Sequence, residues 1–242
     1  MPNLFAPAVL ILVPRLAMAQ GAPGTNIIVD VGVTALSVRG DTAEVTYVLR
    51  NRPGSAEQLF QFTVDAPSSV LRISLPQPEH DWAANASYRG RSVARWAVLG
   101  EQMRPGEDSP PLVFSAVGLP AIVTYWVRGY VPPPPLTPAD TLPVVPPSDP
   151  LVANSLPGRT VGIAPFPNDG GLSNLLARLL TLTDESCGAL GWITSTSVCS
   201  SLTAKLQQAG EALVQADNTK ARTQLESFLA ELAAQHGRAV CP

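Results

Sequence analysis

Residues 191–240, GWITSTSVCSSLTAKLQQAGEALVQADNTKARTQLESFLAELAAQHGRAV, determine how the C-terminal part of the chain folds. Apolar residues recur there every three or four positions in two separate runs. The first run is Leu202, Leu206, Ala209 and Leu213, and the second is Leu225, Phe228, Leu229 and Leu232. This spacing predicts two amphipathic helices, each with one apolar stripe.

Polar residues mark the ends of both helices. Residues 195–197, Ser-Thr-Ser, provide side-chain oxygens that cap free N–H groups at the start of the first helix. Residues 217–219, Asp-Asn-Thr, interrupt the apolar pattern, and Gly237 suits the position after the second helix. Because the connection is short, the two helices are expected to be antiparallel neighbours.

Two helices in a hairpin cannot bury both stripes, so a third apolar element is needed. The leucine-rich segment 172–182 supplies it, and residues 188–194 form the turn that leads to the next helix. We expect a small three-helix bundle over residues 170–240. Trp192 and Ile193 are expected to fill one end of its core.

The same segment contains a pattern of short motifs: G-W-I-T, S-L-x-x-K-L-x-x-A, A-x-x-Q-L-x-x-F-L and a late His-Gly pair. The residues that carry it are Gly191, Trp192, Ile193, Ser201, Leu202, Lys205, Leu206, Ala209, Ala221, Gln224, Leu225, Phe228, Leu229, His236 and Gly237. Over roughly residues 171–240 the chain resembles the C-terminal helical module of bacterial secreted proteins known as the FIMAH domain. The resemblance implies an extracellular accessory or attachment module without an established catalytic role, and it assigns no functional residue.

The composition limits the classes of function. The chain has 242 residues, of which 14% are charged and 45% hydrophobic, enough to bury the cores of one or two domains. The net charge of −3 and the pI near 5.4 argue against an electrostatic nucleic-acid surface. The densest basic group, Arg89, Arg91 and Arg95, shares one face of a strand and forms a small basic patch. We therefore expect no nucleic-acid partner.

The N-terminus has features of a secretory signal peptide. Residues 8–13 are apolar, and residues 17–19, Ala-Met-Ala, form an A-x-A cleavage pattern. The apolar run is too short to span a bilayer, and no other stretch approaches the roughly twenty apolar residues needed. We expect residues 1–19 to be removed and the mature protein to be secreted or periplasmic, without a stable membrane span.

Three cysteines fit an oxidising compartment. Cys187 and Cys199 flank the 188–194 turn, whose glycines allow the chain to fold back tightly. A Cys187–Cys199 disulfide is the favoured pairing. Cys241 follows the last helix, whose end approaches Cys199, so Cys199–Cys241 is the competing pairing.

From Thr25 the sequence is typical of β-strands. Alternating or β-branched segments are separated by Gly, Pro and Asn, and Arg39-Gly40-Asp41 fits a hairpin turn. The predicted strands cover 27–38, 43–49, 60–64, 71–75, 93–99, 112–117 and 121–131. This pattern predicts an antiparallel, immunoglobulin-like β-sandwich over 25–131, followed by the helical bundle.

Residues 132–150, PPPPLTPADTLPVVPPSDP, are too rich in proline to join the interior of a sheet. They form either a stiff spacer in polyproline II conformation or a strap across the sandwich. Residues 151–169 follow as an edge strand or a connector. If that strand joins the sheet, the sandwich domain extends to 165.

Few residues of the chain suggest catalysis. The two histidines, His80 and His236, lack companions at zinc-ligand spacing, and no nucleophile or nucleotide-binding motif occurs. The turn carboxylates form no recognisable pair: Asp65, Glu79, Asp81, Glu101, Glu107 and Asp108. We expect no catalytic residue, metal or cofactor, and a protein that is not an enzyme. The alternative is a secreted hydrolase with an unrecognised carboxylate site that includes Glu79 or Asp81.

Aromatic residues crowd the second half of the predicted sandwich. Tyr125 and Trp126 are neighbours on one strand, so one of them faces outward unless both sides of the sheet are covered. An exposed aromatic face suits stacking on sugars or docking a partner, and packing by the proline-rich segment is the competing explanation. The candidate binding residues are Trp82, Tyr88, Tyr125 and Trp126. The expected function is a non-catalytic secreted or surface protein that binds a polymer, a glycan or a partner protein.

Overall fold

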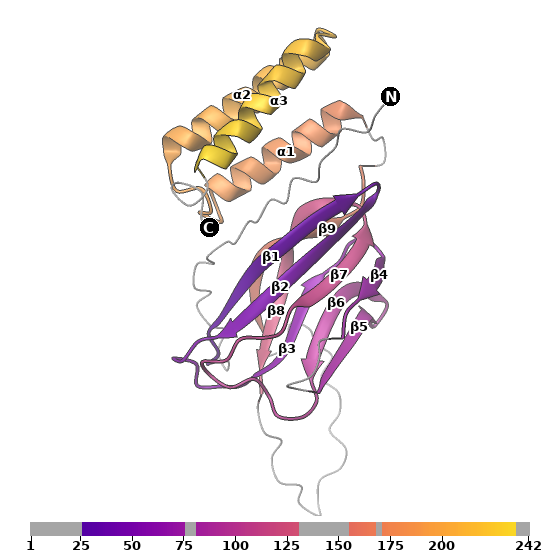
Figure 1. Cartoon of the computed structure of the whole chain (residues 1–242), viewed down its shortest axis with the longest axis vertical. Helices are drawn as coiled ribbons and strands as arrows, with labels where there is room; N and C mark the ends of the chain where they lie inside the picture. The colour runs from indigo at the N-terminus through magenta and orange to yellow at the C-terminus, as the bar shows by residue number, and fades with distance from the viewer. Residues whose placement is uncertain (1–25, 76–80, 131–154, 168–170, 236–242) are drawn as a thin grey trace, which may run out of the picture.

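The structure is a computed structural model that describes residues 26–75, 81–130, 155–167 and 171–235. Within these ranges the chain forms nine strands and then three helices (Figure 1). Several predictions concern residues outside the described ranges: the signal peptide (1–19), the proline-rich segment (132–150), Glu79, His80, His236, Gly237 and Cys241.

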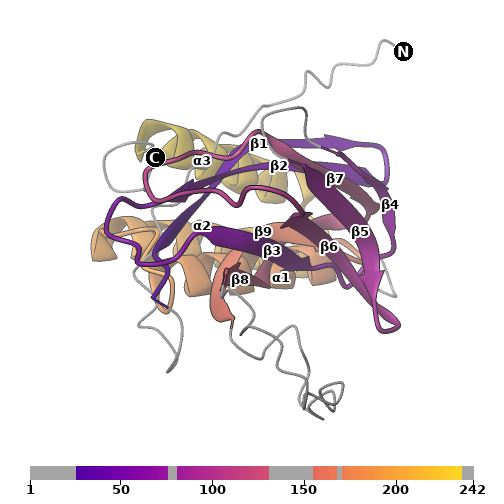
Figure 2. The ribbon, with the colours of Figure 1, turned by 90° about the horizontal axis from the view of Figure 1, so that it is seen from below.

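The strands form two antiparallel sheets that lie in two layers (Figure 2). The four-stranded sheet has the order β1-β2-β7-β4 and consists of β1 (Val29–Arg39), β2 (Thr42–Asn51), β7 (Leu112–Val117) and β4 (Val70–Ile73). The five-stranded sheet has the order β5-β6-β3-β8-β9 and consists of β5 (Trp82–Tyr88), β6 (Arg91–Val98), β3 (Leu59–Asp65), β8 (Leu119–Gly129) and β9 (Leu156–Ala164). The predicted β-sandwich followed by a helical region is confirmed.

The sandwich core is organised around Tyr47 of β2, which is fully buried. Its ring stacks on Phe114 and meets Phe62 and Trp96 edge-on, with ring centroids 5.5–6.3 Å apart. Its hydroxyl donates to the carbonyl oxygen of Val161 at 2.7 Å, and this bond joins β2 to β9 of the other sheet. Burial raises the pKa of Tyr47 well above its ordinary value, so the hydroxyl remains a donor.

Strand β5 was not predicted from the sequence, because its centre is built of small residues, AANAS, that show no apolar alternation. The segment 151–169 contains β9, an edge strand that pairs with β8 from Leu156 to Ala164, so the sandwich includes it. The pairing is close at Gly158, where only a glycine fits, because a Cβ there would lie 2.2 Å from the ring of Tyr125.

The helices are α1 (Leu172–Cys187), α2 (Thr196–Val214) and α3 (Asn218–Gln235). Helix α2 packs against both other helices and buries Leu202, Leu206 and Ala209. Helix α3 buries only Ala221 and Phe228 among its described residues. The apolar stripe predicted for α3 is therefore only partly covered, and Leu229 is 59% exposed.

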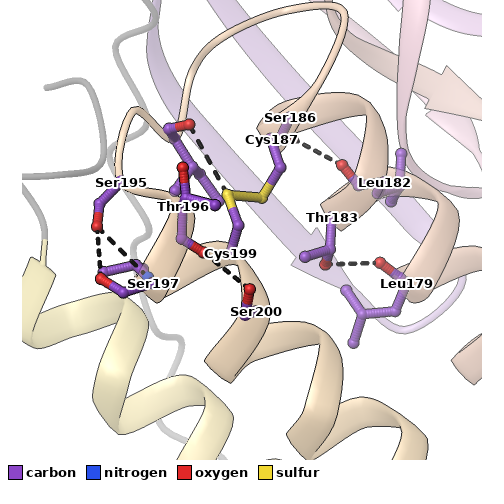
Figure 3. The surroundings of a disulfide bond; sticks show 12 residues. Leu179, Leu182, Thr183, Ser186, Cys187, Ser195, Thr196, Ser197, Cys199 and Ser200 are labelled. Carbon is purple, nitrogen blue, oxygen red and sulfur yellow. Dashed lines mark hydrogen bonds between the residues drawn. A yellow bond between two sulfur atoms is a disulfide. The ribbon is translucent and has the colours of Figure 1, made fainter.

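The turn between α1 and α2 is fixed by covalent and capping interactions (Figure 3). Cys187 at the end of α1 and Cys199 in α2 form a disulfide with Cα atoms 5.9 Å apart, the pairing favoured from the sequence. The side chain of Ser195 accepts from the backbone N–H of Val198, which confirms the predicted cap of α2. Asp217 likewise accepts from the backbone N–H of Lys220 at the start of α3.

Trp192 lies in a different place from the one predicted. Ile193 belongs to the buried cluster of the helices, as expected, but Trp192 belongs to the buried cluster of the sandwich. Leu190 also packs against the sandwich cluster. The turn thus places its tryptophan on the sheets instead of closing the end of a bundle, because the neighbouring sandwich offers a larger apolar surface to cover it.

Polar contacts reinforce this junction, in which α1 is the helix nearest the sheets (Figure 1). Arg178 of α1 donates at 3.0–3.4 Å to three backbone carbonyl oxygens where β8 begins and β9 ends, those of Pro165, Leu119 and Pro120. Burial there lowers the pKa of Arg178. Arg159 of β9 pairs with Glu185 of α1 at 3.3 Å. The helices are thus held against the β8–β9 edge of the sandwich.

Candidate functional site: the outer face of the five-stranded sheet

Side chains along a strand alternate between the two faces of a sheet. Phe62 of β3, Trp96 of β6 and Tyr125 of β8 lie in the core, so their neighbours in sequence lie on the outer face. Phe60 is also outside the core, because β3 has a register shift between Leu59 and Gln61 that interrupts the alternation. The outer face thus carries Phe60, Gln61, Thr63, Asp65, Tyr88, Arg91, Arg95, Trp126 and Arg128. We call these residues, together with Arg89 in the β5–β6 turn, the arginine–aromatic face.

The β5–β6 hairpin widens this face. It pairs with β3 through β6, so β5 forms the far edge of the sheet. Its tight turn places Arg89 and Gly90 at positive φ, 49° and 78°. A register shift after Asn85 sets Tyr88 opposite Arg91, on the outer side. The hairpin therefore contributes one aromatic ring and several of the cations of the face.

Each aromatic ring on this face lies against a guanidinium group. Arg91 lies over the ring of Trp126, with its guanidinium carbon 5.0 Å from the ring centre. Arg95 and Arg89 both lie over Tyr88, at 5.2 and 5.8 Å. On β3 and β8, Arg128 lies over Phe60 at 5.9 Å, and Tyr130 also packs against Phe60. Such cation–π contacts favour positions of the long arginine side chains over the rings.

Hydrogen bonds connect the centre of the face. Arg95 Nη2 donates to Gln61 Oε1 at 2.9 Å, and Gln61 Nε2 donates to Thr63 Oγ1 at 2.9 Å. Gln61 and Thr63 are nearly fully buried although they point outward, which fits arginine side chains lying above them. Asp65 accepts from Arg91, with distances of 3.2 Å to Nε and 3.1 Å to Nη2.

Burial has the largest influence on the charge of Arg95 at the centre of the face. Burial lowers the pKa of Arg95, the nearby Tyr88 opposes this shift, and the positive charge of Arg128 adds a smaller lowering contribution. The Nε of Arg95 is buried and has no hydrogen-bond partner among the described residues.

The four aromatic residues predicted as binding residues divide between the two sides of the sheet. Tyr88 and Trp126 lie on the arginine–aromatic face, whereas Trp82 and Tyr125 lie in the sandwich core. Burial, with a smaller contribution from Asp30, raises the pKa of Tyr125 to about 12. The sequence left two alternatives for Tyr125 and Trp126, an exposed ring or a ring covered on its side of the sheet, and both rings are covered, with 6% exposure each. Tyr125 is covered by the opposite sheet, and Trp126 lies beneath Arg91.

The sequence identified part of this arrangement and missed another part. Arg89, Arg91 and Arg95 stood out as the densest basic group. Phe60 and Arg128 did not, since their partnership depends on the pairing of β3 with β8. No local pattern reveals that pairing.

Of the carboxylates considered for hydrolysis, Glu79 lies outside the described residues, and several of the others are held in ion pairs with arginines. Asp65 pairs with Arg91, Glu101 with Arg104, and Asp108 with Arg50. Asp81 is exposed beside Gly100. Over residues 26–75, 81–130, 155–167 and 171–235, no group of three or more His, Cys, Asp or Glu residues is arranged to hold a metal ion.

A hollow of about 550 Å³ lies beside the disulfide, between the α1–α2 turn and α2. Among the described residues that line it, Asp184 is the one ionisable side chain apart from the bonded cysteines. That lining offers no pair of groups for acid–base chemistry. As for membranes, none of the helices in the described part of the chain is long and apolar enough to cross a bilayer.

No family model, no curated protein and no solved structure matches this chain. The resemblance of residues 171–240 to the FIMAH domain remains a prediction.

Proposed function

We propose that the protein is a non-catalytic, secreted or surface-located binding protein whose sandwich recognises a polymer, a glycan or a partner protein. The helical region serves to attach or assemble it. The observation that carries the proposal is the arginine–aromatic face, in which each arginine lies over an aromatic ring, with its guanidinium carbon 5.0–5.9 Å from the ring centre. Groups fixed in advance lose little entropy when a ligand binds, so such a face favours recognition.

The disulfide of the helical region supports the proposed location outside the cytoplasm. A Cys187–Cys199 disulfide is typical of proteins that fold in oxidising compartments. The A-x-A pattern at residues 17–19 fits export by a cleaved signal peptide. Mass spectrometry of the protein from its host would test this, and an intact Met1 in the cytoplasmic fraction would contradict it.

We place the sandwich among the immunoglobulin-like folds and the helices among three-helix bundles related to the FIMAH domain. The order β1-β2-β7-β4 corresponds to the A-B-E-D sheet of a constant-type domain, and β3-β8-β9 corresponds to C-F-G. In this assignment the β5–β6 hairpin is an insertion between strands D and E. In the helical region, Ser201 and Lys205, both part of the FIMAH-like pattern, bond Glu231 of α3.

A direct test exposes the purified mature protein to a glycan array, a panel of soluble polymers and a panel of hydrolase substrates. The expected result is saturable binding without turnover. Substrate turnover that disappears in an Asp81→Asn variant would establish the hydrolase alternative. If the purified protein binds no polymer, no glycan and no partner protein, the proposal is contradicted.

A further inference from the structure

The arginine–aromatic face combines two features that point to the chemistry of its ligand. The chain as a whole carries a net charge of −3, yet this face gathers Arg89, Arg91, Arg95 and Arg128. Asp65 is the carboxylate that lies among them in the described structure. A local excess of positive charge on an acidic protein selects for a negatively charged partner.

The rings of the face are already occupied, and this distinguishes between kinds of ligand. Neutral sugars and nucleic-acid bases bind proteins by stacking on free aromatic surfaces. Here Trp126 is 6% exposed and lies beneath Arg91, while two arginines lie over Tyr88. The rings therefore support the guanidinium groups, and the N–H edges of those groups are the parts that can meet a ligand.

The face also contains an example of how it holds a carboxylate. One oxygen of Asp65, Oδ1, lies within 3.2 Å of both Nε and Nη2 of Arg91. The edge of a guanidinium group on this face thus holds a carboxylate oxygen through charge-assisted hydrogen bonds. Arg95 has similar surroundings, with Nη2 on Gln61 and a buried Nε that lacks a partner among the described residues.

The positions of the arginines suit a ligand with repeated charges. Arg91 and Arg95 lie four residues apart on β6, a separation of about 13 Å along the strand. Arg128 lies on β8, with β3 between it and β6. A flat surface with cations spaced over several strands fits an extended polymer that carries one charge on each of its units better than a single small anion.

We propose that the arginine–aromatic face binds an acidic polysaccharide, one that bears carboxylate groups along its chain. This inference rests on the proposed function and specifies its ligand. The carboxylates meet the N–H groups of Arg95 and Arg128, and the aromatic rings beneath keep these groups in place. Arg91 adds positive charge, although its Nε and Nη2 are held by Asp65. Because the contacts are charged and partly exposed, the binding weakens as salt concentration rises.

Polygalacturonate is a suitable probe, since each of its sugar units carries one carboxylate. Its fully methyl-esterified form has the same backbone without the charges and serves as the matched ligand. The full chain is expected to bind polygalacturonate in low salt and to bind the ester at least tenfold more weakly. Arg95→Gln and Arg128→Gln are each expected to weaken binding about tenfold. Arg72→Gln is the matched control, because Arg72 is an exposed arginine of β4 in the other sheet.

The possible outcomes distinguish a failure of the acidic-polysaccharide assignment from a failure of the proposed binding function. Equal binding of polygalacturonate and its ester, or an equal loss of affinity in Arg72→Gln and Arg95→Gln, overturns the acidic-polysaccharide assignment. If the protein binds a neutral glycan or another protein, and Arg95→Gln and Arg128→Gln do not change that binding, the acidic-polysaccharide assignment is also overturned. The broader binding function is then still supported. Tighter binding of polyglutamate or DNA than of polygalacturonate assigns the face to another class of polymer. Absence of binding to any of these ligands contradicts both proposals. Unchanged melting temperatures in the variants show that their folds are intact.

Discussion

The sandwich and the helical region are stabilised in different ways. The sandwich buries one continuous cluster of large side chains, with Tyr47, Phe62, Trp96 and Phe114 at its centre. The helical region buries a smaller cluster, built around Leu202, Leu206 and Phe228. It compensates with local links: a disulfide, capped helix ends and an ion pair between α2 and α3. Burial dominates the stability of the first region, and specific links contribute a larger share in the second.

The largest effect is expected from removing a central side chain of the sandwich. Trp96 is completely buried and contacts three other rings, so Trp96→Ala should lower the free energy of unfolding by about 3–5 kcal/mol. Leu229→Ala is the matched control in the helical region, with an expected change within about 0.5 kcal/mol because Leu229 is 59% exposed. Urea unfolding of both variants measures the difference. Similar values for the two would show that the regions do not differ in the way described.

The disulfide should be the strongest single link of the helical region. Cys187→Ser opens a loop with a sequence separation of 12 and should cost about 2–3 kcal/mol. Hydrogen exchange is expected to accelerate in α1 and α2 and to stay unchanged in the β-strands. Cys241→Ser, the control, should have little effect. A non-reduced peptide that links Cys199 to Cys241 would show that the competing pairing forms instead.

A smaller effect is expected from one hydroxyl group in the sandwich. Tyr47→Phe keeps the ring contacts but leaves the buried carbonyl oxygen of Val161 without its donor. The expected loss is about 1 kcal/mol, measured by thermal or urea unfolding. Because the bond joins β2 to β9, hydrogen exchange in β9 should increase more than in β1. Unchanged protection of β9 would mean that packing alone holds this strand.

Local patterns in the sequence predicted the parts of the fold that depend on neighbouring residues. Alternation identified most strands, helical spacing identified the helices, and the glycine-containing turn between Cys187 and Cys199 indicated the disulfide. Strand β5 escaped because alanines and serines occupy positions where alternation would show. Contacts between distant segments were not predictable in this way. Trp192 packs on the sandwich, and Arg128 reaches Phe60, only because of strand order and docking that no local pattern contains.

In the candidate site, too, the sequence indicated which residues take part but not which of them contact one another. Tyr88 and Trp126 were identified from aromatic content, and the basic group of β6 was identified from its spacing. The contacts between these two groups follow from the registers of β5 with β6, of β6 with β3 and of β3 with β8. The outward position of Trp126 is therefore compatible with its burial, because the arginine side chain above it replaces water.

The ion pair between α2 and α3 gives the smallest effect and a pH dependence. Lys205 Nζ lies 2.5 Å from Glu231 Oε2, and Ser201 also donates to that carboxylate. The bond from Lys205, with a smaller contribution from Ser201, lowers the pKa of Glu231. A carboxyl group with a lowered folded-state pKa stabilises the protein above its unfolded pKa of about 4.3. That contribution is lost as the pH falls through the lowered value.

Glu231→Gln removes this contribution, so the variant should be less stable than the wild type at pH 7 by less than about 1 kcal/mol. The small size follows from the exposure of the two side chains, 22% and 21%. The difference between the two proteins should shrink toward zero as the pH falls below the ordinary glutamate pKa, measured by unfolding at a series of pH values. Glu226→Gln is the control, because Glu226 pairs with Arg222 on an exposed side of α3 and should show no such trend. A difference for Glu231→Gln that is the same at pH 7 and pH 3 would mean that the carboxylate contributes through packing and not through its charge.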